Sequence, residues 1–148
     1  MEARGATWEE IDLGGKVWNI PADRMKAGRA HRVPLADRVV KLLEALPRIE
    51  GETLVFPGSK EKTPLSDMSL TMLLRRHAPG FTAHGIRSSF RDWAAETTSY
   101  PGEVCEMALA HAVGDAVEAA YRRGDLFAKR AALMQDWAAY ATQPQAAA

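Results

Sequence analysis

The stretch of sequence that decides the fold reads Thr82-Ala-His-Gly-Ile-Arg-Ser-Ser-Phe-Arg-Asp-Trp93. A helix is expected to begin at or just after His84 and to run to about Thr97, before the turn-rich residues 99–102. His84 and Arg87 lie three residues apart, so both side chains can face one point from the same helix turn. Such a pair can bind a phosphate, because a guanidinium donates two hydrogen bonds and an imidazole donates one or accepts a proton. A surface helix with a capping histidine gives the same bare pattern.

Three more segments carry groups that suit phosphodiester chemistry. They read Arg24-Met-Lys26, Leu109-Ala110-His111 and Tyr121-Arg122-Arg123. A tyrosine hydroxyl has an unperturbed pKa of about 10, so it needs help in losing its proton before it can attack. Taken singly, the segments are also typical of a solvated lysine, a histidine that ends a helix, and a tyrosine that packs its ring. Their order and spacing favour an attack on a phosphodiester that uses no metal.

In combination, these segments resemble the catalytic domain of tyrosine recombinases, in particular the integrases of temperate phages and genomic islands. The resemblance extends from Glu2 to about Tyr140. It implies that the chain belongs to an enzyme that cuts and rejoins DNA at specific sites. The expected partner is double-stranded DNA carrying attachment sites, and no cofactor is expected.

The resemblance also implies a role for each candidate catalytic residue. Tyr121 would attack the scissile phosphate and form a 3′-phosphotyrosyl bond, which keeps the energy needed for rejoining. Arg87, His84 and His111 would stabilise the pentavalent state, and Lys26 would protonate the departing 5′ oxygen. Further cations would contact the DNA backbone. This second set is Arg24, Arg29, Arg32, Arg122 and Arg123.

The sequence departs from the family pattern at the first catalytic arginine. By resemblance, that arginine precedes a glutamate that aligns with Glu2, so it would lie upstream of Met1. Arg4 follows this glutamate, and we do not assign the catalytic role to it. Loss of one donor to a developing oxyanion slows chemistry by about 10²–10³, and loss of an arginine in phosphoryl transfer by about 10³–10⁵. The expectation is a truncated catalytic domain, without the N-terminal DNA-clamping domain, that is nearly inactive alone.

The first third of the chain is expected to form a small antiparallel sheet. Residues 7–12, 16–20 and 31–35 alternate or have strand-like composition, with turn signals between them. Pro34 lacks an N–H group, which predicts that its strand lies at the edge of the sheet. Lys26 would lie in or beside the last hairpin.

The rest of the chain is expected to be helical, and the fold class is therefore α+β and mostly α-helical. Ser66 is a candidate N-cap for the second of the predicted helices. Residues 1–142 would form one domain and residues 143–148 a frayed tail. The last helix has an apolar face that can pack on its own domain or pass to a second protomer of a homo-oligomer on DNA. The helices are predicted over residues 36–46, from 66 into the mid-70s, 84–97, 103–110, 116–123 and 126–140.

Composition limits the remaining possibilities. The formal net charge of the 148 residues is zero, which fits either a basic face hidden in a neutral total or ordinary solvated charge. The single cysteine, Cys105, excludes an internal disulfide and is expected to be a buried helix residue. The histidines lack the spacing of a metal site, so no metal is expected. With no candidate membrane span or signal peptide, the expected location is the cytoplasm, and the resemblance implies a bacterial cell and association with the nucleoid.

The sequence is also compatible with three other functions. A non-catalytic DNA-binding or protein-interaction module of the same fold would not depend on Tyr121. A nicking enzyme similar to type IB topoisomerases would share the chemistry without exchanging DNA partners. An unrelated helical interaction domain is favoured mainly by the neutral total charge.

Overall fold

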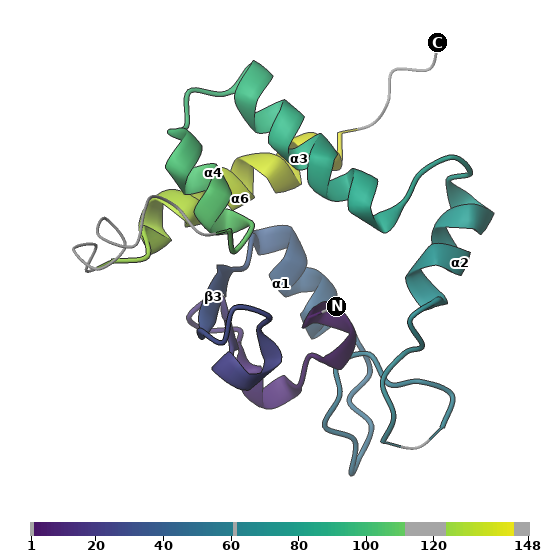
Figure 1. The fold of residues 1–148 in the computed structure, drawn as a ribbon. Helices are drawn as coiled ribbons and strands as arrows, with labels where there is room; N and C mark the ends of the chain where they lie inside the picture. Colours follow the sequence, from purple (N-terminus) through teal and green to yellow (C-terminus); the bar gives the residue numbers. More distant parts are fainter. Residues whose placement is uncertain (1, 61, 112–123, 144–148) are drawn as a thin grey trace.

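A small three-stranded sheet is followed by a group of helices, as Figure 1 shows for a computed structural model that describes residues 2–60, 62–111 and 124–143. The prediction of an α+β, mostly helical fold is confirmed. The predicted helix at residues 116–123 lies outside the described residues.

The sheet consists of β1 (Ile11–Asp12), β2 (Val17–Ile20) and β3 (His31–Pro34), in the antiparallel order β1-β2-β3. The order places β3 at an edge, as the proline in that strand predicts. The strand predicted over residues 7–12 is wrong in its first part, because Trp8–Glu10 forms a 3₁₀ helix, η2.

The carboxylate of Glu10 explains why this segment leaves the extended conformation. It accepts hydrogen bonds from the backbone N–H of Thr7 at 3.4 Å and from the Trp18 indole at 2.9 Å, and it pairs with Arg24. Burial acts to raise the pKa of Glu10, but the hydrogen bonds from Arg24, Trp18 and Thr7 outweigh it, and the net shift is downward. The hydrogen bonds of the Glu10 side chain with Thr7, Trp18 and Arg24 therefore favour a helical turn over the extended strand that the alternating pattern predicts.

One hydrophobic cluster lies between the sheet and helix α1 (Asp37–Glu44). The segment at 54–57 joins this cluster, since Val55 donates a backbone hydrogen bond of 2.8 Å to Ala6. Trp8 and Trp18 cover its margin. The buried members are Ala6, Leu35, Val40, Leu43 and Val55.

A second cluster lies between α3 (Ala83–Thr97), α4 (Gly102–Ala108) and α6 (Phe127–Ala141). It contains an aromatic stack in which the ring centroids of Trp93 and Trp137 are 5.1 Å apart. Cys105 is buried here as predicted, and burial raises the pKa of its thiol. The buried members are Phe90, Trp93, Ala94, Val104, Cys105 and Leu133.

Helix α2 (Ser69–His77) differs from the other described α-helices because none of its residues is buried. It stands to one side in Figure 1, and its main packing partner among the described elements is α3. The prediction that Ser66 caps it is wrong, since the helix begins at Ser69 and Met68 is the N-cap. The Ser66 hydroxyl instead hydrogen-bonds the Ser69 hydroxyl at 2.9 Å.

Arg130 links the two clusters, although it is a charged residue with only 1% of its surface exposed. Its guanidinium donates to the carbonyl oxygen of Arg32 in β3 at 2.6 Å and to the carbonyl oxygen of Asp125 at 2.7 Å. It also pairs with the Asp125 carboxylate at 2.9 Å, and that carboxylate accepts two hydrogen bonds of 2.9 Å from the Arg32 guanidinium. Helix α6 is thereby fixed to the edge of the sheet.

Replacing Arg130 with methionine is expected to destabilise the fold by about 3 kcal/mol or more, because two carbonyl oxygens and the Asp125 carboxylate lose a donor that lies buried between them. Urea unfolding followed by circular dichroism would measure the change. Lys129→Met, at the exposed neighbouring position, is the matched control and should stay within about 0.5 kcal/mol of the wild type. Equal stability of the two variants would contradict the assigned role of Arg130.

Tyr100, in the connection between α3 and α4, provides a pH-dependent test of the packing of this connection on α6. Its hydroxyl donates a hydrogen bond of 2.6 Å to Asp136, which, with burial, raises its pKa to about 12. The neutral phenol is thus favoured in the folded state, so this stabilisation is complete below pH of about 10 and is lost as the pH rises towards 12. Spectrophotometric titration should show a late tyrosine transition that is missing in Tyr100→Phe, whereas Tyr140→Phe should retain it.

Candidate active site

The amino end of α3 presents His84 and Arg87 at the surface, while its other half is held in the second cluster. The helix begins one residue before the predicted start because the Thr82 side chain accepts a hydrogen bond of 2.9 Å from the Gly85 N–H. Both candidate side chains are exposed. A rigid helix therefore carries them to solvent, where a phosphate can reach them.

Arg87 connects two of the predicted motifs. Its guanidinium donates a hydrogen bond to the carbonyl oxygen of Leu109, in the Leu109-Ala110-His111 segment that follows α4. Helix α4 ends earlier than predicted, at Ala108, because Ala110 takes a left-handed conformation with φ of 56°. The resulting reversal places this segment beside α3.

His111 lies next to an acidic residue that the sequence interpretation did not include. Its Nδ1 is 2.5 Å from a carboxylate oxygen of Glu106, and the second oxygen of Glu106 is 2.8 Å from Nε of Arg91. The pKa of Glu106 is lowered, chiefly by the hydrogen bond with His111 and also by Arg91, against the effect of burial. The available sequence signals were the positions of Arg91, four residues after Arg87, and Glu106, five before His111.

The N-terminal segment reaches the same region. Glu2 has a lowered pKa, for which a backbone hydrogen bond is the largest cause, and the positive charge of Arg87 also contributes. Glu2 in turn acts electrostatically on the half-buried His31 in β3. Burial lowers the pKa of His31 and the charge of Arg130 adds to this shift, while Asp125 opposes it. The sheet and the helices therefore border one charged region.

Some of the other candidate cations are exposed to solvent, and others form ion pairs with acidic side chains. Lys26 and Arg29 are exposed in the loop before β3, and among the described residues no hydrogen bond joins Lys26 or His84 to the Arg87–His111 group. Arg24 points inward, where it pairs with Glu10 and donates to the carbonyl oxygen of Glu2 at 2.5 Å. Arg32 pairs with Asp125 on the outer side of β3.

The proposed nucleophile, Tyr121, lies outside the described residues, as do Arg122 and Arg123. The described chain resumes at Gly124 and is held at Asp125 by Arg32 and Arg130. Arg4 lies elsewhere, with hydrogen bonds of 2.9 Å to the carbonyl oxygen of Leu65 and 2.7 Å to Asp67.

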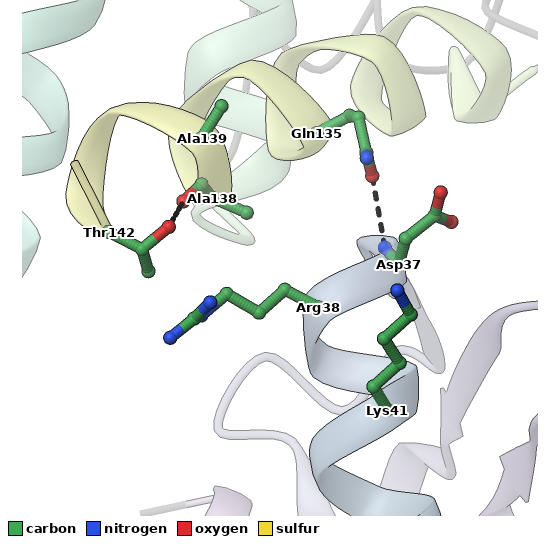
Figure 2. Close-up of a pocket in the computed structure, with 7 residues that line it drawn as sticks. All are labelled: Asp37, Arg38, Lys41, Gln135, Ala138, Ala139 and Thr142. Carbon is green, nitrogen blue, oxygen red and sulfur yellow. Dashed lines mark hydrogen bonds between the residues drawn. The ribbon is translucent and has the colours of Figure 1, made fainter.

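A polar groove of about 250 Å³ lies between α1 and α6 (Figure 2), apart from the candidate active site. Gln135 crosses it and accepts a hydrogen bond of 3.0 Å from the N–H of Asp37, which satisfies the first turn of α1. Its lining shares no residue with the group around Arg87 and His111. The lining residues are Asp37, Arg38, Lys41, Gln135, Ala138, Ala139 and Thr142.

Neither a metal-binding cluster nor a membrane-spanning helix is found in the part of the chain that the structure describes. No group of three or more histidine, cysteine or acidic side chains is arranged to hold a metal ion among these residues. Within the same residues, no helix is both long enough and apolar enough to span a membrane.

Comparison with known proteins gives consistent results. Prophage integrase IntA of Escherichia coli K12 is 38% identical over 141 residues, which cover 93% of this chain and 34% of the relative. Prophage integrase IntZ of the same organism is 34% identical, and the integrase of Shigella phage Sf6 is 30% identical. These matches cover 93% of this chain and 35% and 37% of the respective relatives.

The chain thus spans about a third of the length of the curated relatives that it matches. No solved structure matches it. The profile of the phage integrase family matches residues 1–125, a region that contains every described residue of the candidate active site. This 148-residue chain therefore belongs to the phage integrase family.

Proposed function

We propose that the chain is a catalytic-domain part of a site-specific DNA recombinase that works through a 3′-phosphotyrosyl intermediate. The observation that best supports this proposal is the hydrogen bond from Arg87 to the Leu109 carbonyl oxygen. It brings together the two motifs that the reaction needs at one phosphate, although they lie 22 residues apart in the sequence. Family membership supports the same reaction class.

In this mechanism, the oxygen of Tyr121 attacks the scissile phosphorus, and the phenolic proton passes to solvent. The bond from phosphorus to the 5′ oxygen breaks, and Lys26 donates the proton that the leaving oxygen needs. Arg87, His84 and His111 donate hydrogen bonds to the non-bridging oxygens, whose negative charge grows during attack. A 5′ hydroxyl from a second DNA end reverses the steps, so strands are exchanged without an external energy source.

We further propose that the loop before β3 contributes to DNA binding. Arg29 is exposed there and can contact a backbone phosphate without breaking an ion pair between described residues. Arg24 and Arg32 are held by Glu10 and Asp125, so their proposed contribution is to fix the two ends of this loop and to add to its positive field. Arg122 and Arg123 would extend the contact beside the nucleophile.

The isolated 148 residues are proposed to react slowly. No arginine of these 148 residues is assigned the role of the first catalytic arginine, and without such a donor the negative charge on the phosphate is less well stabilised. Full activity would also involve a homo-oligomer on DNA. The proposed contact is helix α6, which here packs on its own α4 and β3 but leaves Tyr140 49% exposed.

A second candidate function is a module that binds DNA or protein without cutting. The zero net charge favours it, because DNA-binding domains are usually basic. Dependence on Tyr121 distinguishes the two candidates, since only the recombinase needs this hydroxyl.

Covalent trapping tests the proposed reaction. An oligonucleotide that ends in a 3′ nitrophenyl phosphate should form an adduct with the wild-type chain, and added guanidinium should increase its rate by about 10-fold or more. Tyr121→Phe should form none. Tyr140→Phe is the matched control and should react like the wild type. An adduct that persists in Tyr121→Phe, or no adduct in any sample, would exclude the proposed role of Tyr121.

The salt dependence of DNA binding tests the loop. Each phosphate contact releases counterions, so Arg29→Ala should lower the slope of log K against log salt concentration by about 1. Lys60→Ala removes one positive charge from an exposed bend in the segment before α2 and is the control. Fluorescence anisotropy with a labelled duplex would measure both. Equal slopes for the two variants would show that Arg29 does not contact DNA.

A further inference from the structure

We infer that Glu106 is a positioning residue that holds the His111 ring so that Nε2 is the nitrogen presented to the phosphate. This inference rests on the proposed function, because it assigns the geometry of one of its phosphate-binding groups.

The turn after α4 forms a Schellman motif. The N–H of His111 donates to the carbonyl oxygen of Glu106 at 2.9 Å, and the N–H of Ala110 donates to that of Met107 at 3.1 Å. Ala110 has the left-handed φ of 56° that this motif requires. Because the motif brings its last residue back over the residue five positions earlier, the side chains of His111 and Glu106 must meet.

In many Schellman motifs this side-chain contact is apolar. Here it is a hydrogen bond, with 2.5 Å between Nδ1 of His111 and a carboxylate oxygen of Glu106. An ionised carboxylate can only accept, so Nδ1 must carry the proton. The contact therefore selects the Nδ1–H tautomer and leaves Nε2 as the nitrogen that is free to face a ligand.

Arg91 fixes the other side of this arrangement. Its Nε lies 2.8 Å from the second oxygen of Glu106, so both carboxylate oxygens have a partner. Arg91 lies one helical turn after Arg87 on α3. Two arginines one turn apart on α3 thus hold the segment before His111. Arg91 binds the Glu106 carboxylate, and Arg87 binds the Leu109 carbonyl oxygen.

The ring remains accessible to DNA despite these contacts, because 47% of the His111 side-chain surface is exposed, against 29% for Glu106. A carboxylate behind a histidine serves two purposes in such a site. It prevents the ring from rotating, and it keeps Nε2 directed at the phosphate oxygen to which the protonated ring would donate.

The test measures the tautomer of His111 by ¹⁵N NMR of the full chain with ring-labelled histidine, without DNA and at a pH of about 9, well above the ordinary pKa of an imidazole. His111→Gln assigns the signals among the four histidines. The wild type should show the Nδ1–H form. Glu106→Ala should shift the ring towards the Nε2–H form that free imidazole prefers, whereas Glu96→Ala, at an exposed position of α3, should not.

The tautomer of the wild type decides the inference even if Glu106→Ala fails to fold. An Nε2–H ring in the wild type would overturn it, and so would an unchanged tautomer in a folded Glu106→Ala.

The trapping reaction gives a second, independent readout. Adduct formation by Glu106→Ala in the presence of guanidinium should fall about 10–100-fold, with part of the rate restored in Glu106→Gln, whose side-chain oxygen can still accept from Nδ1–H. A rate unchanged in Glu106→Ala would overturn the positioning role. Failure of the wild type to form any adduct would count against the proposed function alone, because the tautomer is measured without DNA.

Discussion

The buried guanidinium of Arg130 is the contact on which the relation between the two hydrophobic clusters depends. Leu133, one turn further along α6, is fully buried in the second cluster, while Arg130 binds the backbone of β3 beside the first. Helix α6 thus contacts the second cluster through the apolar side chain of Leu133 and the sheet through the charged side chain of Arg130. A buried charge is tolerated here because three oxygen atoms receive its hydrogen bonds.

The same arrangement determines how the candidate site is assembled. Its residues come from η1 (Glu2–Gly5), from α3 and from the turn after α4, and each of these lies in or beside one of the clusters. Arg87 reaches Leu109 because α3 and α4 share the second cluster, and α6 holds that cluster against the sheet, so that the charge of Arg87 contributes to the lowered pKa of Glu2. The charged region is therefore a product of tertiary packing.

Much of the fold could be predicted from periodicity and turn signals. The edge strand β3 and helices α1, α3 and α6 lie within one or two residues of their expected bounds, because the helices have an apolar face and the strand is bounded by turn signals. Residues 8–10 and the start of α2 could not be predicted, since side-chain hydrogen bonds of Glu10 and Ser66 decide the conformation there. Local propensity does not include such contacts.

The candidate site was predictable only in part, for a similar reason. The sequence identifies His84, Arg87 and His111 as candidates, but the role of Glu106 depends on the left-handed backbone of Ala110, which an alanine does not indicate. Arg24 has the sequence context of a basic surface and instead pairs with Glu10. The neutral total charge is a weak guide because many acids are partners of specific basic groups.

The placement of the tryptophans has a consequence for optical measurements. Trp8 and Trp18 border the first cluster, where the ring of Trp8 lies 3.5 Å from the guanidinium carbon of Arg48 and the Trp18 indole donates to a carboxylate. Trp93 and Trp137 belong to the aromatic stack of the second cluster, close enough for their transitions to couple. Each cluster therefore contains its own pair of chromophores, so fluorescence can distinguish the separation of α3 from α6 from the loosening of the sheet.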